Sequence, residues 1–192
     1  HLPVSYVLDD LAYLLEEIKK VEFDKPIWLK LSPYMTSCQL GWFAEDYPHL
    51  NFANTPTVSD WFIDDLCDLL ITHARTIQAI VMTNTIPNVT YDDAIIVKND
   101  DGTVQHHKGG LSGSILRHHN LMLIDQMVAT GITANIDIIG CGGVMTGDDA
   151  LAYLEKGCVA VACTSGPNWY GNPKFFSDLL QESDELLNFL SN

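Results

Sequence analysis

The stretch that decides the fold is residues 136–165, IDIIGCGGVMTGDDALAYLEKGCVAVACTS. An apolar run, residues 136–139, leads into three glycines within four residues. A short helical pattern follows, which Thr146 can cap and Gly157 can end. A second apolar run, residues 159–163, closes the stretch on a polar turn. Short apolar strands that alternate with helices are typical of a parallel sheet buried on both faces.

The ends of these two strands predict an anion site. Gly142 and Gly143 follow the first strand, and Thr164 and Ser165 follow the second. Glycines allow backbone N–H groups to approach a ligand closely, and such groups bind phosphate. In a (β/α)8 barrel, the loops after strands 7 and 8 commonly hold a phosphate. The alternative is that the glycines only make tight turns.

Two earlier apolar runs, residues 27–31 and 79–83, predict further strands with polar residues at their ends. Lys30 lies within the first run, so it either meets an anion above the strand ends or lies at an edge in solvent. Asn84 and Thr85 follow the second run. Asparagine offers two donors and an acceptor, which suits an amide or carboxylate ligand, although both residues are also common turn formers.

Helical patterns surround these four strands. They cover residues 9–20, about 59–74, 114–130 and a last helix from Asn172 onward. The whole chain, residues 1–192, therefore reads as one α/β domain with four parallel strands.

Two segments interrupt the alternation of strand and helix. Residues 34–56 are rich in aromatic residues and turn formers without a clean period, which indicates an insertion on the active-site face that could be a lid, a substrate wall or an interaction surface. Residues 94–98 and 103–107 flank an Asp-Gly turn and predict a β-hairpin. Gly109 and Gly110 then open a second loop at which backbone could approach a ligand.

Composition excludes several classes of protein. The chain has 192 residues, a hydrophobic fraction of 47% and a formal net charge of −15, which argues against nucleic acid or an anionic membrane as partner. No apolar run approaches the ~20 residues that a membrane span needs. The five cysteines are scattered, and the paired histidines diverge on either strand or helix, so neither a disulfide framework nor a metal site is expected. A cytoplasmic location is the simplest expectation, with a mitochondrial one left open.

Five motifs in this order resemble the C-terminal half of a dihydroorotate dehydrogenase, a family of FMN-dependent (β/α)8 TIM barrels. The motifs are Trp-Leu-Lys-Leu-Ser-Pro at 28–33, Thr-Asn-Thr at 83–85, Lys-Gly-Gly-Leu-Ser-Gly at 108–113, Gly-Cys-Gly-Gly-Val at 140–144 and Cys-Thr-Ser at 163–165. The resemblance runs over nearly the whole chain and is weakest across residues 36–56. It implies an oxidoreductase of pyrimidine biosynthesis that converts dihydroorotate to orotate.

The resemblance also implies roles for single residues. Lys30 matches a lysine that contacts the flavin ring, and Asn84 and Thr85 match a pair that contacts orotate. Glycines and hydroxyl residues match the remaining flavin contacts. Gly109 and Gly110 match a loop along the flavin, and Gly142, Gly143, Thr164 and Ser165 match the grip on the FMN phosphate.

The chain departs from the family in ways that leave alternatives open. Its four strands match strands five to eight of the barrel, and the family's Asn-x-Ser-x-Pro-Asn loop, which carries the catalytic base, has no counterpart here. No catalytic residue is therefore identified in this segment, and the other half comes from a longer chain or a partner chain, with a homodimer as one form. The alternatives are a flavin barrel like that of dihydropyrimidine dehydrogenase and a non-catalytic half barrel that serves as a structural or assembly subunit.

Overall fold

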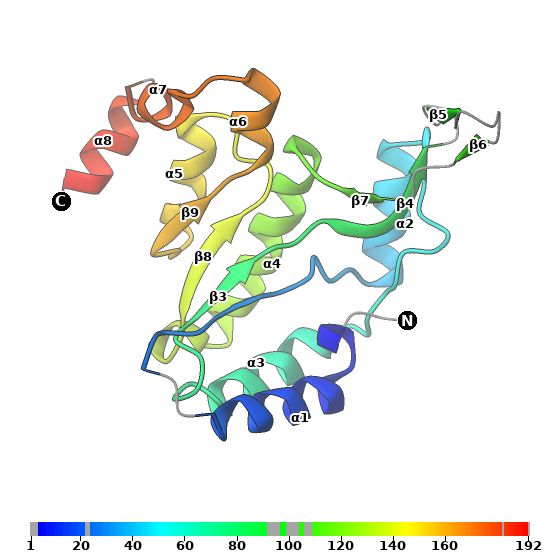
Figure 1. The fold of residues 1–192 in the computed structure, drawn as a ribbon, viewed down its shortest axis with the longest axis vertical. Helices are drawn as coiled ribbons and strands as arrows, with labels where there is room; N and C mark the ends of the chain where they lie inside the picture. The colour runs from blue at the N-terminus through cyan, green and yellow to red at the C-terminus, as the bar shows by residue number, and fades with distance from the viewer. Residues whose placement is uncertain are drawn as a thin grey trace.

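A four-stranded parallel sheet forms the centre of the protein (Figure 1). The computed structural model describes residues 4–21, 24–91, 97–98, 104–105, 109–181 and 183–191. The strands are β1 (Trp28–Lys30), β3 (Ala79–Met82), β8 (Asp137–Cys141) and β9 (Ala160–Ala162), in the order β1-β3-β8-β9. All three pairings are parallel, which confirms the four strands expected from the apolar runs.

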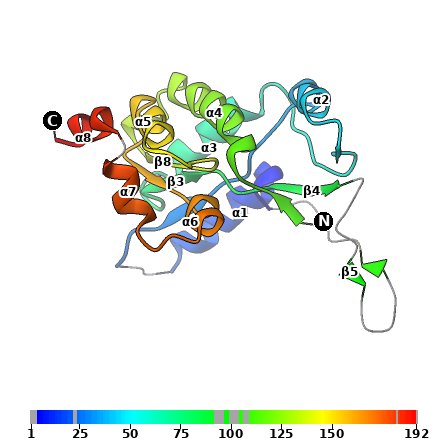
Figure 2. The ribbon, with the colours of Figure 1, turned by 90° about the horizontal axis from the view of Figure 1, so that it is seen from above.

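Helices cover one face of this sheet. They are α1 (Leu8–Lys19), α3 (Phe62–Thr72), α4 (Arg117–Ala129) and α5 (Gly147–Glu155). Figure 2 shows α3, α4 and α5 along the same side of the sheet. Leu29, Ile80 and Ile138 occupy paired positions and belong to the main apolar core, so their side of the sheet faces the helices. Their neighbours Lys30 and Val81 therefore point to the other face, because side chains alternate along a strand.

A second, smaller layer lies at the carboxyl end of the parallel strands. It contains α2 (Ser37–Asp46) and an antiparallel sheet in the order β2-β4-β7, formed by β2 (Leu50–Asn51), β4 (Ile86–Tyr91) and β7 (Gly109–Leu111). Six buried apolar residues form its own core: Met35, Leu50, Phe52, Ile86, Val89 and Leu116. This layer occupies the right of Figure 1, away from α5 and β9.

The segment at residues 34–56, expected as an insertion and without a clean period in its sequence, contains helix α2. Thr36 and Gln39 form a capping box that begins the helix. None of the residues of α2 is fully buried, and its apolar contact with the smaller core is limited to the partly buried Leu40 and Phe43. The helix follows β1 in the chain, and its place on the active-site face stays a prediction.

Two further expectations from the sequence are corrected in this layer. Gly109 and Gly110 lie in strand β7, not in a loop before a helix. Strand β4 was not expected, because Pro87 and Asn88 interrupt its pattern; Asn88 has a φ of 61°, and the register with β7 shifts between Ile86 and Val89.

The two paired strands of the expected hairpin are confirmed. Strands β5 (Val97–Lys98) and β6 (Val104–Gln105) pair in antiparallel fashion, with Val97 opposite Gln105. Its turn at 99–102 lies outside the described residues.

The C-terminal region corrects two more expectations. The polar turn expected at Thr164 and Ser165 is the start of helix α6 (Ser165–Tyr170). The single last helix is two helices, α7 (Phe175–Gln181) and α8 (Asp184–Ser191), because the Ser183 hydroxyl accepts the Leu186 N–H and begins a new helix. Within the described part of the chain, no helix has the length and apolar character to span a membrane.

Short 3₁₀ turns complete the elements. They are η1 (Val4–Tyr6), η2 (Ser114–Leu116) and η3 (Ile132–Ala134). The helix expected from residue 114 therefore begins as the turn η2 and continues as α4.

Candidate functional site

One pocket lies at the carboxyl ends of the four parallel strands, and it collects most of the residues that the sequence analysis proposed. The pocket has a cavity volume of about 60 Å³, and about 410 Å³ when the open space at its mouth is included. Seven of the nine proposed residues line it: Lys30, Asn84, Thr85, Gly142, Gly143, Thr164 and Ser165. Gly110 is not among the described residues that line it.

Lys30 provides the positive charge of this pocket. It is the last residue of β1, is exposed, and is paired with Val81 on the face of the sheet away from the helices. Among the described residues that line the pocket there is no carboxylate. In a chain with a net charge of −15, a pocket lined by a lysine and no acid favours an anionic ligand.

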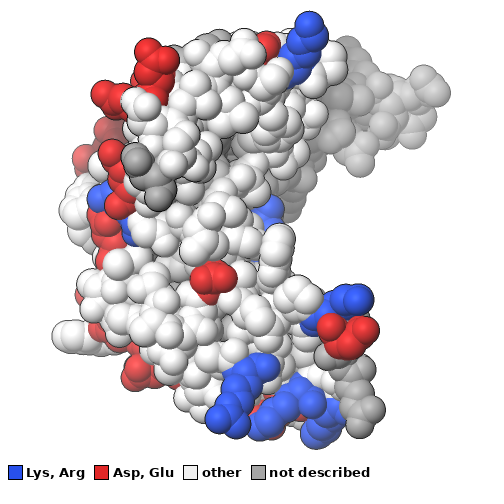
Figure 3. All heavy atoms as spheres, turned by 90° about the vertical axis from the view of Figure 1, so that its left-hand side faces the viewer, with Lys and Arg blue, Asp and Glu red and all other residues white. Residues whose placement is uncertain are grey.

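The charges elsewhere on the surface contrast with this pocket. In Figure 3, acidic side chains gather on the left of the face that is shown, and the hollow on the right carries few charged side chains. The excess of acid is therefore unevenly distributed.

Asn84 and Thr85 are held at the end of β3 by the chain itself. The Asn84 N–H donates to the Leu31 carbonyl at 2.8 Å, and the Thr85 N–H donates to Asn84 Oδ1 at 2.9 Å. Because Oδ1 is already used, the amide chiefly offers its N–H donors to a ligand. A Cβ on Gly110 would overlap the Thr85 side chain, so that glycine lets β7 pass close to this turn.

Gly142 and Gly143 form the turn after β8, with φ values of 118° and 73°. A Cβ on Gly142 would overlap the amide of Asn120, and a Cβ on Gly143 would overlap the backbone of Arg117. Close packing against α4 therefore requires glycine at both positions. This requirement is separate from the approach of a ligand that the sequence suggested.

Thr164 and Ser165 line the same pocket, where β9 passes into α6. The Ser165 hydroxyl lies 3.4 Å from the Ser112 hydroxyl, which also lines the pocket. These hydroxyl groups add donors that suit a phosphate or a carboxylate.

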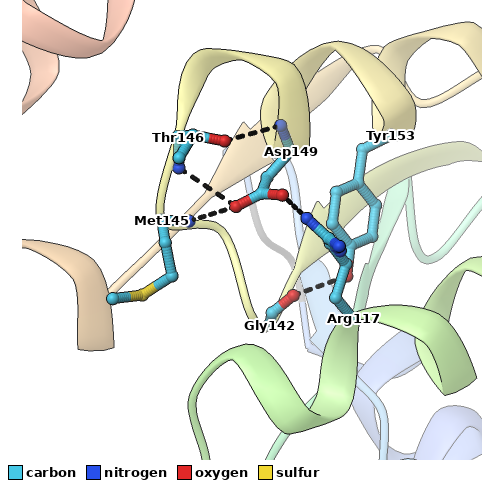
Figure 4. Close-up of polar contacts among 6 residues, drawn as sticks. All are labelled: Arg117, Gly142, Met145, Thr146, Asp149 and Tyr153. Carbon is cyan, nitrogen blue, oxygen red and sulfur yellow. Dashed lines mark hydrogen bonds and ion pairs between the residues drawn. The ribbon is translucent and has the colours of Figure 1, made fainter.

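Two buried residues that contact the glycine turn, Asn120 and Tyr153, were missed by the sequence analysis, and Thr83 was noted only as part of the Thr-Asn-Thr motif. Asn120 is fully buried; its Nδ2 donates to the Cys141 carbonyl at 3.0 Å, and its Oδ1 lies 2.9 Å from the Thr83 hydroxyl. The Tyr153 hydroxyl donates to the Gly142 carbonyl at 2.6 Å (Figure 4). Burial raises the pKa of Tyr153, and its contact with Asn120 acts the other way, so the phenol remains a neutral donor.

An ion pair supports this group from α4 and α5. Asp149 is 4% exposed, pairs with Arg117, and accepts the N–H groups of Met145 and Thr146 at 2.9 and 3.0 Å (Figure 4). The pattern Thr146-x-x-Asp149 is a capping box, a signal that the sequence shows. Its ion pair with Arg117 has no such signal, because the partners lie on different helices.

The residues present fit the phosphate-bearing flavin that the family resemblance implies. A glycine turn, a pair of hydroxyl residues and a lysine meet at the ends of four strands, with no acid among the described lining residues. Among the described residues, no group of three or more histidine, cysteine or acidic side chains is arranged to bind a metal ion.

Comparison with known proteins agrees with this architecture. The family model for dihydroorotate dehydrogenase matches residues 7–187. The catalytic subunit of dihydroorotate dehydrogenase B (NAD(+)) from Listeria monocytogenes is 32% identical over 179 residues, which cover 92% of this chain and 48% of the relative. The mitochondrial dihydroorotate dehydrogenase (quinone) of Arabidopsis thaliana is 27% identical over 75% of this chain and 29% of its own.

Solved structures agree on the fold. A ligand-free DHODH from Eimeria tenella superposes with a TM-score of 0.62 at 20% identity, over 97% of this chain and 47% of that one. The chain thus spans about half the length of the relatives that it matches most fully. With the family model covering most of the sequence and the parallel half barrel in place, the chain belongs to the dihydroorotate dehydrogenase family.

Proposed function

We propose that this chain forms the C-terminal half of the barrel of an FMN-dependent enzyme that oxidises dihydroorotate to orotate. The observation that carries the proposal is the meeting of Lys30, Asn84, the Gly142–Gly143 turn and Ser165 in one pocket free of acidic lining residues among those described. When bound, FMN supplies the hydride chemistry of such enzymes. This chain holds the phosphate, places a positive charge and orients the substrate.

Lys30 and Asn84 have distinct roles in this proposal. The Lys30 ammonium group stabilises negative charge that develops on the pyrimidine end of the flavin ring. The Asn84 amide donates hydrogen bonds to the planar, anionic substrate. Gly142, Gly143, Thr164 and Ser165 bind the phosphate through backbone N–H and hydroxyl groups.

The catalytic base of the proposed reaction lies outside this segment. Cys38 is exposed in α2 and does not line the pocket. Cys163 lines the pocket, but burial, and secondarily the nearby Cys141, raise the pKa of its thiol, which disfavours the thiolate. The electron acceptor also depends on regions beyond this half, and the relatives' names divide between NAD(+) and quinone.

Anaerobic mixing of the intact protein with dihydroorotate tests the proposal. We expect a yellow protein whose flavin colour is bleached by dihydroorotate and not by dihydrouracil. Bleaching by dihydrouracil alone would favour the dihydropyrimidine dehydrogenase-like alternative, and a colourless protein that takes up no FMN would favour the structural subunit.

Lys30→Met gives the test at the level of a residue. Loss of one preorganised charge at developing negative charge costs about 10²–10³ in rate, so the bleaching should slow by that order. The matched control is Lys25→Met, since Lys25 is exposed beside Asp24 and does not line the pocket. Equal rates for the two variants would contradict the role of Lys30.

A further inference from the structure

The feature that carries a further inference is the group of buried polar side chains behind the Gly142–Gly143 turn. Asn120 and Tyr153 are both 0% exposed and neither lines the pocket, yet both donate hydrogen bonds to carbonyl groups of the turn. Their donors are directed at consecutive peptide groups. Asn120 binds the Cys141 carbonyl, which the Thr83 N–H also binds at 2.6 Å, and Tyr153 binds the Gly142 carbonyl.

The geometry of the peptide bond gives these contacts a consequence. In a trans peptide the C=O and N–H groups of one unit point in opposite directions. The Cys141 carbonyl shares its peptide with the Gly142 N–H, and the Gly142 carbonyl shares its peptide with the Gly143 N–H. Holding the two carbonyl groups toward Asn120 and Tyr153 therefore turns the two N–H groups away from these side chains, and both glycines line the pocket.

We infer that Asn120 and Tyr153 are positioning residues that aim the Gly142 and Gly143 N–H groups at the phosphate of the ligand; this rests on the proposed function. Two adjacent N–H groups directed into one concavity bind an anion more strongly than a mobile turn does, because their orientation is fixed before the ligand arrives. Neither side chain touches the ligand itself.

Neighbouring groups fix the orientation of the Asn120 and Tyr153 side chains. The Asn120 amide can have only one orientation, because its Nδ2 meets a carbonyl group, which accepts only, and its Oδ1 meets the Thr83 hydroxyl. The ring of Tyr153 fills the space that Gly140 leaves, since a Cβ on Gly140 would overlap it. Removing only the hydroxyl of Tyr153 therefore leaves the packing in place.

Tyr153→Phe in the intact protein tests the inference with two ligands that differ only in the phosphate, FMN and riboflavin. Binding is measured by quenching of flavin fluorescence, and apo-protein thermal unfolding checks the fold. We expect the Kd for FMN to rise about threefold to tenfold, as for the loss of one hydrogen bond, and the Kd for riboflavin to stay within about twofold. Asn120→Leu, which has a similar volume and no donor, should show the same selective loss.

Tyr34→Phe is the matched control. Tyr34 is 1% exposed and lies in the same apolar core without lining the pocket, so its variant should keep the preference for FMN over riboflavin. If Tyr153→Phe weakens both flavins equally, or keeps the full preference for FMN, the inference is overturned while the proposed function stands. If the unaltered protein binds FMN and riboflavin equally, the proposed phosphate site is wrong, and both the proposed function and the inference are contradicted.

Hydrogen exchange provides a measurement that does not depend on a variant. Inorganic phosphate added to the unaltered intact protein should slow amide exchange in a peptide that spans residues 140–146. Unchanged exchange at saturating phosphate would overturn the phosphate site of the proposed function together with the inference that rests on it.

Discussion

Gly142 is constrained both by its backbone conformation and by its packing against Asn120. Its φ of 118° excludes most side chains, and the Asn120 amide occupies the space of a Cβ. The glycine that the sequence predicts to let a ligand approach the backbone is therefore also required by the fold. Replacement of Gly142 by a larger residue would alter the packing as well as any contact with the proposed ligand, so the hydroxyl of Tyr153 is the better target for the binding experiment.

Gly142→Ala should lower the free energy of unfolding by about 2–4 kcal/mol, from backbone strain together with overlap against Asn120. The matched control is Gly157→Ala, because Gly157 has a φ of 93° and nothing within 4 Å of a Cβ, so that only about 1 kcal/mol of strain remains. Urea unfolding measures both. Equal costs for the two variants would show that the contact with Asn120 does not limit residue 142.

Helix α4 joins the two layers of the protein through a buried histidine. His119 is 2% exposed, and its Nε2 lies 2.9 Å from the Tyr34 carbonyl, which can only accept, so Nε2 carries a proton. Its ring also meets Phe43 of α2 at a centroid distance of 6.2 Å. Burial lowers the pKa of His119 to about 4, with a smaller opposing effect from the Tyr34 hydrogen bond and a small lowering from His118.

The lowered pKa predicts acid sensitivity of this contact between layers. Since the folded ring stays neutral while the unfolded ring takes up a proton below about 6.5, the contribution is fully present above that pH. It is lost progressively as the pH falls toward 4, up to about 3 kcal/mol. The free energy of unfolding, measured against pH, should fall less steeply for His119→Gln, whereas His118→Gln at the exposed neighbour should follow the original curve. A slope unchanged in His119→Gln would contradict the prediction.

The whole molecule presents an unfinished sheet. Strands β1 and β9 are its outer strands, and in the described structure each has a single strand neighbour within that sheet. Trp28 on β1 is 62% exposed, and Ala160 on β9 is exposed as well. Parallel strands are normally covered on both faces. The face of the sheet away from the helices and the outer edges of β1 and β9 are therefore where the rest of a barrel would pack.

The 192-residue chain by itself should consequently self-associate as its concentration rises, which light scattering after size exclusion measures. Ala160→Lys should reduce this association, because a charged residue on an edge strand opposes strand pairing. Ser191→Lys adds the same charge at the exposed end of α8, far along the chain from the sheet, and should have no effect. A chain that stays monomeric at all concentrations would contradict the open-sheet account.

The sequence by itself determined the parallel sheet and most of the candidate site. Short apolar runs separated by helical patterns leave few arrangements, and the polar residues at the ends of parallel strands must meet at one edge of the sheet. That rule alone brings Lys30, Asn84, Gly142 and Ser165 together, and the structure places them in one pocket. The family resemblance, read from the same motifs, agrees with the family model.

Only the tertiary structure decided the second layer and the support behind the glycine turn. Helix α2 has no fully buried residue, and β4 pairs across a shifted register, so the local sequence signal of each element is weak. Asn120 lies 37 residues from Thr83 and 21 from Cys141. A polar residue in a helix looks the same in sequence whether it faces water or a buried carbonyl, because its hydrogen-bond partners are chosen by packing between distant segments and not by its neighbours in the chain.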